Sequence, residues 1–220
     1  MAGLLITMEG VEGSGKSTQI QRLADRLGRA GVPVAVSKEP GGTVLGQSIR
    51  ALLLEPHPSG ETWAPKAELM LFYADRAQHV ATFIRPMLEQ GKVVLLDRFE
   101  DSTRAYQGAQ GISDGLLDRM AEVVLGRMKP TLTLVLDVDP AESMVRVRVR
   151  NSADEAFRET RFDEETLAFH RRVRSRFLII AQKEPQRVAV IPARESADKV
   201  EAAVWAKVAP LMRTAGYRVE

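Results

Sequence analysis

Short hydrophobic runs alternate along the chain with longer stretches in which apolar and polar positions follow a helical period. The runs are rich in β-branched residues or leucine, which favours buried strands; they are Leu4–Met8, Val32–Val36, Val93–Leu96, Leu132–Leu136 and Val188–Ile191. Strands that alternate with helices are typical of a parallel sheet covered on both faces. The pattern therefore predicts an α/β fold.

The periodic stretches predict helices over Lys16–Ala30, Leu45–Leu54, Lys66–Glu89, Ser113–Leu125, Ala141–Arg150, Glu164–Lys183 and Ser196–Met212. One of these predictions has an alternative. Valine and arginine alternate from 145 to 150, and this period of two indicates a strand, whereas the flanking residues favour a helix. Both interpretations stay open at this stage.

The composition of the 220-residue chain fits one α/β domain and excludes several classes of site. With 31 basic and 29 acidic residues the net charge is only +2, so nucleic-acid binding has little support. The absence of cysteine excludes disulfides, thiolate metal sites and thiol catalysis. No apolar run is long enough to span a membrane and no targeting signal is visible, so we expect a soluble cytoplasmic protein without a membrane or nucleic-acid partner.

A phosphate-loop pattern, G-x-x-x-x-G-K-[ST], follows the first hydrophobic run. Its glycines let backbone N–H groups turn toward an anion, Lys16 can reach the β- and γ-phosphates, and Ser17 offers a hydroxyl to Mg²⁺. A glycine turn before an ordinary helix is the alternative, but strand, loop and helix occur in the order that phosphate binding needs. The residues predicted to bind a nucleoside triphosphate such as ATP are Gly10, Glu12, Gly13, Ser14, Gly15, Lys16, Ser17 and Thr18.

Two further motifs follow predicted strands. Asp97 and Arg98 come directly after Val93–Leu96, at the strand end where open α/β sheets bind ligands. The carboxylate is positioned for Mg²⁺ or for an acceptor oxygen, and a surface Asp–Arg pair is the alternative. The segment from Glu39 to Gly42, which includes Pro40, follows the second run and predicts either a rigid loop near the ligand or a plain turn.

Phe72 and Arg76 are four residues apart on a predicted helix, so they share one face. An aromatic ring beside a guanidinium suits a base that is stacked and hydrogen-bonded at a carbonyl oxygen. The alternative is a core phenylalanine and a solvated arginine.

Arginines are concentrated at positions 146, 148 and 150, before a polar, acidic stretch from Asn151 to Arg161. A lid that brings guanidinium groups to the transferring phosphates would stabilise charge in the transition state. The alternative is a solvated basic face followed by a surface linker.

The segment from Glu55 to Pro65, which contains prolines and glycine, also has two interpretations: it is a loop that covers a site, or it is a linker.

Five ordered motifs resemble the thymidylate kinase family, in its bacterial type with an arginine-rich lid: Glu9–Ser17, Glu39–Thr43, Phe72–Arg76, Asp97–Phe99 and Ala105–Gly108. The resemblance implies a three-layer phosphate-loop kinase fold, with a five-stranded parallel sheet in the order 2-3-1-4-5. It implies one domain over residues 1–220, with a lid at about 143–162, and a homodimer. The implied reaction is transfer of the ATP γ-phosphoryl group to dTMP, giving dTDP and ADP with Mg²⁺, as a step toward dTTP.

The resemblance also implies roles for single residues. Lys16, Asp97 and Arg98 would act in catalysis, with Arg148 and Arg150 from the lid ahead of Arg146 and Arg161. Ser17, Asp97 and Glu39 would act near the metal. On the acceptor side, Glu12 would contact the sugar 3′-hydroxyl, Arg50 and Arg98 the phosphate, and Tyr106 the ribose 2′ position. Phe72 would stack on thymine, Arg76 would bond its O4 atom, and Thr103 and Gln107 would face its N3 edge, with Glu39 and Pro40 nearby.

The chain departs from the family pattern in the lid. Residues 151–159 are inserted, and the segment then reads Thr160-Arg161-Phe162-Asp163, so Arg161 lacks the acidic residue that usually precedes it. Asp154 and Glu155 in the insertion offer alternative partners for the arginines. The insertion therefore changes how the lid would close.

Three competing functions remain as alternatives. The first is another phosphate-loop kinase, acting on a nucleoside or a different monophosphate; a nucleoside acceptor would not need both Arg50 and Arg98. The second is a nucleotide-dependent switch, but the Asn-Lys-x-Asp motif of guanine-specific switches is absent. The third is a nucleic-acid-binding ATPase, which predicts more aromatic residues than the 5% found.

Overall fold

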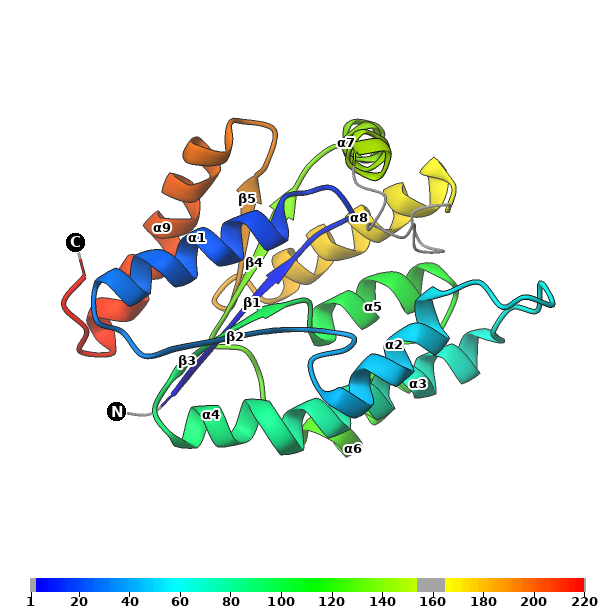
Figure 1. The fold of residues 1–220 in the computed structure, drawn as a ribbon, viewed down its shortest axis with the longest axis horizontal. Coiled ribbons are helices and arrows are strands. Elements are labelled where there is room, and N and C mark those ends of the chain that lie inside the picture. The colour runs from blue at the N-terminus through cyan, green and yellow to red at the C-terminus, as the bar shows by residue number, and fades with distance from the viewer. Residues whose placement is uncertain (1–2, 154–164, 220) are drawn as a thin grey trace.

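A parallel sheet forms the centre of the computed structural model, which describes residues 3–153 and 165–219. The five strands lie in the order β2-β3-β1-β4-β5, as the resemblance implied (Figure 1). Their bounds are β1 Leu4–Glu9, β2 Val34–Lys38, β3 Val93–Asp97, β4 Leu132–Asp137 and β5 Val188–Pro192. The central strand β1 pairs with β3 on one side and β4 on the other, so Thr7 lies between Leu96 and Thr133.

The helices connect and cover these strands: α1 Lys16–Arg29, α2 Val44–Leu54, α3 Pro65–His79, the π-helical η1 Val80–Ile84, α4 Arg85–Glu89, α5 Glu100–Ala109, α6 Asp114–Leu125, α7 Pro140–Ala153, α8 Leu167–Lys183 and α9 Ala197–Thr214. Helices α1 and α9 pack against each other beside the sheet (Figure 1). Among the described residues, no helix combines the length and the apolar character that a membrane span requires.

Alternate residues of the strands supply two separate cores. Ile6 and Leu95 pack with apolar residues of α1, α8 and α9. Their sequence neighbours Leu5 and Val94 pack on the other side, with residues of η1 and α6 such as Ile84. Successive strand side chains point to opposite faces, so the continuous hydrophobic runs are those of a sheet buried on both sides. The three-layer α/β fold is therefore confirmed.

Two local differences from the sequence prediction, and the outcome of one open alternative, have physical causes. The expected helix over Lys66–Glu89 contains the π-helical turn η1, and such turns often occur near functional sites. The segment from 145 to 150 is helical, and Val147 is buried while its neighbours on the other face are exposed. Helix α5 was missed because its buried side carries polar residues, including Asp101, Thr103 and Gln107, so it lacks an apolar period.

Candidate active site

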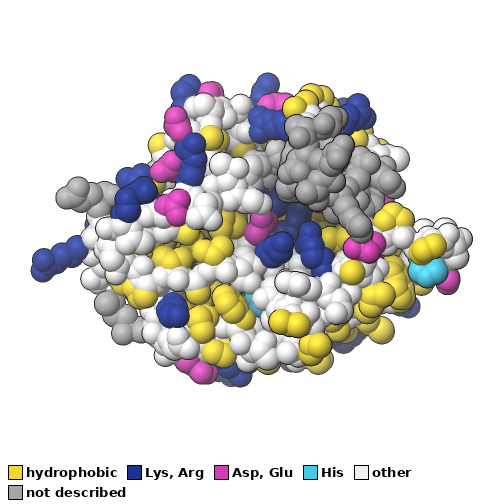
Figure 2. Space-filling model, in the orientation of Figure 1, with side chains coloured by type: hydrophobic (Ala, Val, Ile, Leu, Met, Phe, Trp, Pro, Cys, Tyr) yellow, Lys and Arg dark blue, Asp and Glu magenta, His cyan; other side chains and the backbone are white. Residues whose placement is uncertain are grey.

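A cavity of about 690 Å³ opens beside the phosphate loop and reaches α3 and α5. Figure 2 shows Lys and Arg side chains gathered near the middle of one molecular face. The cavity is lined by most of the predicted site residues: Glu12, Gly13, Gly15, Lys16, Ser17, Thr18, Glu39, Pro40, Arg50, Phe72, Arg76, Asp97, Arg98, Thr103, Tyr106 and Gln107. Gly10 and Ser14 are buried within the loop and do not line it.

The phosphate loop links β1 to α1, and its conformation requires glycine. The backbone φ angle is +69° at Gly13, and a Cβ atom there would lie 2.5 Å from the carbonyl oxygen of Ser143 in α7. Gly15, at φ +94°, precedes the first turn of α1, so the helix N-terminus faces the cavity. Backbone N–H groups at this position attract phosphate.

The Lys16 ammonium lies inside the loop. Its Nζ atom donates hydrogen bonds of 3.1 Å to the Gly10 carbonyl oxygen and 2.9 Å to that of Val11. Burial lowers the pKa of Lys16 to about 8, with a smaller contribution from the nearby Arg98 charge. A cation held in low-dielectric surroundings interacts strongly with phosphate charge.

A hydrogen bond between Ser17 and Asp97 links helix α1 to strand β3 at the cavity. The Ser17 hydroxyl, in the first turn of α1, donates a 2.7 Å hydrogen bond to Asp97 Oδ2 at the end of β3. Mg²⁺ prefers such oxygen ligands and is often held by one or two protein groups together with phosphates and waters. The donor set therefore fits Mg²⁺, although the described residues contain no group of three His, Cys, Asp or Glu side chains arranged for a metal ion.

Glu39 is less well placed for the predicted metal role. Its side chain is buried, and Oε2 accepts a 2.8 Å bond from Arg76 Nε while Oε1 lies 3.0 Å from His79 Nδ1. Both oxygens therefore already contact neighbouring side chains. Glu39 lines the cavity through the loop in which the Glu39–Pro40 peptide bond is cis.

Arg98 has a left-handed backbone conformation, with φ +71°, which is uncommon outside glycine. Glu9 of β1 stabilises this turn, because one of its oxygens accepts a 2.8 Å bond from the Phe99 N–H and the other accepts from the Ser102 hydroxyl. Burial raises the pKa of Glu9 to about 8. The sequence reasoning missed both Glu9 and Ser102 as partners of the Asp-Arg motif.

The Arg98 guanidinium then reaches the phosphate loop. Its NH2 group donates a 2.8 Å bond to Glu12, and the single Tyr106 hydroxyl, which lies 2.7 and 2.6 Å from the two oxygens of the same carboxylate, donates to it. His170 of α8 lies 3.5 Å from the other Glu12 oxygen. Burial alone would raise the pKa of Glu12, but the charges of Arg98 and Lys16 lower it below the usual value.

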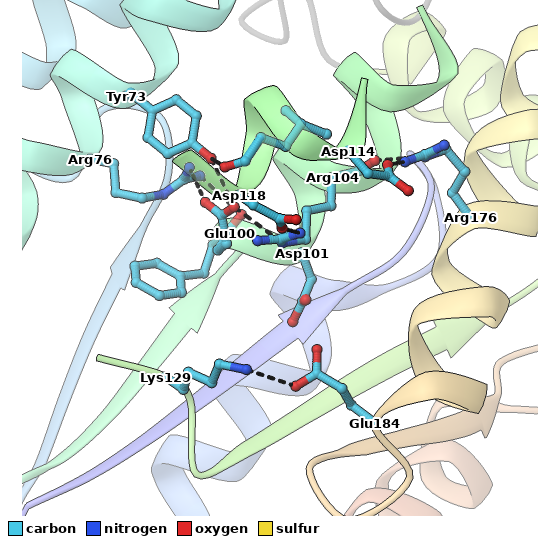
Figure 3. Close-up of polar contacts among 12 residues, drawn as sticks. Tyr73, Arg76, Glu100, Asp101, Arg104, Asp114, Asp118, Lys129, Arg176 and Glu184 are labelled. Atoms are coloured by element: carbon cyan, nitrogen blue, oxygen red, sulfur yellow. Dashed lines mark hydrogen bonds and ion pairs between the residues drawn. The ribbon is translucent and has the colours of Figure 1, made fainter. Parts of the chain in front are cut away.

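Arg76 is buried in a polar network (Figure 3), so the solvated-face alternative is wrong. Besides Glu39, it donates a 2.9 Å bond to Glu100 and a 3.0 Å bond to the Phe99 carbonyl oxygen. The Tyr73 hydroxyl donates a 2.8 Å bond to the other Glu100 oxygen. These contacts engage all three nitrogens of the guanidinium, and the residue also lines the cavity.

The remaining predicted acceptor residues surround the same cavity. Phe72 of α3 is half-buried, and Thr103 and Gln107 of α5 are almost fully buried. Arg50 of α2 donates a 2.9 Å bond to the Pro40 carbonyl oxygen. The cavity is therefore lined by several cationic side chains and also by an aromatic ring and by amide and hydroxyl groups.

Among the α7 arginines, Arg146 lines the cavity and Arg148 does not. Arg148 is exposed, because residues two apart on a helix point in very different directions. Arg146 lies close to Glu142 and donates a 3.1 Å bond to the Ala193 carbonyl oxygen. The predicted order, with Arg148 ahead of Arg146, is therefore not supported here; the Arg150 side chain and the whole of Arg161 lie outside the described residues.

Comparison with known proteins gives a consistent result. The thymidylate kinase family model matches residues 8–204. The chain is 47% identical over 201 residues to the thymidylate kinase of Syntrophotalea carbinolica, covering 91% of this chain and 92% of the relative. It is 46% identical over 207 residues to that of Deinococcus radiodurans, with coverage of 94% and 96%. The crystal structure of thymidylate kinase from Ehrlichia chaffeensis is similar with a TM-score of 0.75 and 34% identity, over 95% of this chain and 99% of that one. The architecture, the phosphate loop and these matches together establish that the chain belongs to the thymidylate kinase family.

Proposed function

We propose that the cavity between the phosphate loop and helices α3 and α5 is where this chain transfers the γ-phosphoryl group of ATP to dTMP. ATP-dependent phosphorylation of dTMP to dTDP is the function of the family to which the chain belongs. The observation that carries the proposal is one cavity lined both by the cationic side chains Lys16, Arg50 and Arg98, which suit phosphates, and by Phe72 and Gln107, which suit a base.

The phosphate loop binds the donor. Backbone N–H groups at the α1 N-terminus hold the ATP phosphates, and Lys16 neutralises charge on the β- and γ-phosphates. In the structure Lys16 bonds two loop carbonyls. ATP would take over some of these donor contacts from the carbonyls when the phosphates arrive.

The opposite part of the cavity binds dTMP. Arg98 and Arg50 hold the acceptor phosphate, which offsets its repulsion from the ATP phosphates. Glu12 accepts from the sugar 3′-hydroxyl, and Tyr106, fixed on Glu12, crowds the 2′ position. Phe72 stacks on thymine while Arg76, Thr103 and Gln107 contact its polar edge.

Ser17 and Asp97 would hold Mg²⁺, with Glu39 nearby. When bound, this ion neutralises charge on the phosphate oxygens of ATP. The protein's own contribution is to align an acceptor phosphate oxygen with the γ-phosphorus and to surround both phosphates with cations. An acceptor that is already an anion at neutral pH needs no strong general base, and no covalent enzyme intermediate is required.

Residues 1–220 form one kinase domain in this proposal, with a lid at about 143–162. Arg146 borders the cavity from the start of this segment. It would stabilise the charge of the transferring phosphoryl group together with Arg150, which lies one helical turn further along α7. The proposed location is the cytoplasm.

The proposed assembly is a homodimer formed through α2 and α3. Val44 and Leu45 of α2 are 85% and 62% exposed, and Met70 of α3 is 61% exposed. Clustered apolar side chains at the surface favour an interface between copies. Sedimentation velocity should give a dimer mass, and Leu45→Glu together with Met70→Glu should give a monomer.

A coupled ADP-release assay tests the substrate directly. ATP and Mg²⁺ are kept constant while dTMP, dUMP, dCMP, dAMP, dGMP and thymidine are compared by kcat/KM. We expect dTMP to be preferred and thymidine to be inactive, because thymidine has no phosphate for Arg50 and Arg98. Preference for any other acceptor would contradict the proposal.

A further inference from the structure

Glu68 of α3 lies behind Gln107, one of the residues proposed to face the base. Both side chains are almost fully buried, and Gln107 Nε2 donates a 2.8 Å hydrogen bond to Glu68 Oε1. Gln107 lines the cavity, whereas Glu68 does not. Glu68 can therefore influence a ligand through Gln107.

This contact fixes which end of the Gln107 amide faces a ligand. A glutamine side chain carries an acceptor oxygen and a donor NH₂ group, whereas Glu68 Oε1 accepts from the amide groups of both Gln107 and Gln110 and therefore serves here as an acceptor. Turning the amide around would set its oxygen against the buried carboxylate and leave acceptors on both sides unsatisfied, which is costly without water. Glu68 thus holds the NH₂ group of Gln107 in a hydrogen bond. Gln107 Oε1 is then the acceptor that remains available in the cavity.

A second glutamine supports the accepting role of Glu68. Gln110 Nε2 also donates to Glu68 Oε1, at 3.1 Å. In the described part of the chain, the buried Gln110 Oε1 atom has no hydrogen-bond partner. Gln110 therefore points its donor at the carboxylate even though its own acceptor is left unsatisfied.

Arg76 supplies hydrogen-bond donors to the same cavity. A guanidinium has five N–H donors and no acceptor, and Glu39, Glu100 and the Phe99 carbonyl each take one of them. The cavity thus presents a fixed donor at Arg76 and, through Glu68, a fixed acceptor at Gln107.

This donor and this acceptor are complementary to the polar edge of thymine but not to that of cytosine. Thymine has an acceptor at O4 and a donor at N3–H, whereas cytosine has a donor amino group at position 4 and an acceptor at N3. We propose that Glu68 is a specificity-determining positioning residue, which holds the Gln107 amide so that the site accepts thymine and rejects cytosine. The inference rests on the proposed function, in which Gln107 faces the N3 edge of dTMP.

The test is Glu68→Gln, measured as kcat/KM for dTMP and for dCMP. A glutamine at position 68 can donate as well as accept, so the Gln107 amide can turn and donate to cytosine N3. We expect the dTMP-to-dCMP ratio to fall by about tenfold or more, the scale of one buried polar mismatch, with KM for ATP unchanged. An unchanged ratio would overturn the inference. Loss of folded enzyme lowers both rates in proportion, so it does not alter the ratio.

Two further variants separate the possible causes. Gln110→Ala removes the other donor to Glu68 without touching Gln107, and it should leave the ratio unchanged; an equal fall would attribute the effect to packing and overturn the inference. Gln107→Leu should lower kcat/KM for dTMP. No loss there would refute the role of Gln107 in the proposed function, and the inference with it. A loss there with an unchanged ratio in Glu68→Gln would overturn the inference alone.

Discussion

The Ser17 hydroxyl donates a 2.7 Å hydrogen bond to the Asp97 carboxylate, although the two residues are 80 positions apart in the sequence. The bond joins the first turn of α1 to the carboxyl end of β3. The two side chains proposed to hold Mg²⁺ are thus adjacent in the structure. Such pre-arrangement reduces the ordering that binding would otherwise require.

Asp97→Asn should lower kcat by about 100-fold, the upper range for removing a group that holds or orients a metal ion. The amide keeps the shape and can still accept from Ser17, so the loss should come from the missing charge. Steady-state rates at saturating ATP and dTMP, across a Mg²⁺ titration, measure this effect, and high Mg²⁺ should restore part of the activity.

Asp137→Asn is the matched control for that variant. Asp137 also ends a strand of the sheet, but it pairs with Arg174 and does not line the cavity. Its kcat should stay within about twofold of the wild type. Similar losses in the two variants, or a loss in Asp97→Asn that is independent of Mg²⁺, would contradict the metal role of Asp97.

The pH dependence of ATP capture should report on Lys16. Burial lowers its pKa to about 8, so the ammonium that attracts phosphate is present below this pH and is lost above it. The value of kcat/KM for ATP reflects the free enzyme, and it should fall toward tenfold per pH unit above pH 8. Lys16→Arg, which stays charged, should be less active but should not show this decline. A flat wild-type profile up to pH 9.5 would refute the assignment.

The parts of the fold that the sequence predicted are those with a local signal. The strands and the phosphate loop are each formed by consecutive residues. Asp97 and Arg98 directly follow a strand, and this position correctly predicted that both line the cavity. Partners that come from distant segments have no such signal. Glu9 meets Phe99 across 90 positions, and Glu68 meets Gln107 across 39. Neither pair could be inferred from spacing.

Buried polar side chains account for the main failures of sequence reasoning. A solvent-exposed Arg76 remained an alternative because arginine is seldom buried unless it is paired. Its partner Glu100 lies in helix α5, which the sequence pattern did not predict. The polar buried side of α5 hid that helix and also supplies Thr103, Tyr106 and Gln107 to the cavity. The same buried polar side chains that line the cavity thus made helix α5 hard to recognise in the sequence.

Arg76→Met should lower the free energy of unfolding by about 3–5 kcal/mol, because it leaves the buried Glu39 and Glu100 carboxylates without their main counter-charge. Urea denaturation at pH 7 measures the change. Adding Glu39→Gln and Glu100→Gln should recover part of the loss, since the isolated charges are then removed.

Arg104→Met is the comparison for Arg76→Met. Arg104 is more exposed; it pairs with the exposed Asp118 and lies 3.3 Å from Glu100, which keeps its bond to Arg76 in this variant. Its removal should therefore cost about 1 kcal/mol or less. Equal destabilisation by the two variants would show that burial of the ion pairs around Arg76 does not decide their contribution.

Glu9→Gln should make the protein more stable at pH 8 and change how stability depends on pH. Burial, followed by the nearby Asp101 charge, raises the pKa of Glu9 from 4.5 to about 8. A carboxyl group with a raised pKa stabilises the folded state fully below pH 4.5, and this contribution is lost as the pH rises toward 8. Glutamine stays neutral, can accept from the Phe99 N–H and can donate to the Ser102 hydroxyl.

The unfolding free energies of the wild type and Glu9→Gln are compared by urea denaturation from pH 5 to 8. Their difference reports the contribution of the Glu9 carboxyl group alone. Asp75, whose pKa burial raises to about 6, is present in both proteins and therefore cancels. Each unit of pKa shift corresponds to about 1.4 kcal/mol, so the variant should gain about 2–4 kcal/mol relative to the wild type across this range. Parallel curves would mean that Glu9 does not take up a proton on folding, and the turn at Arg98 would then be held by an ionised carboxylate.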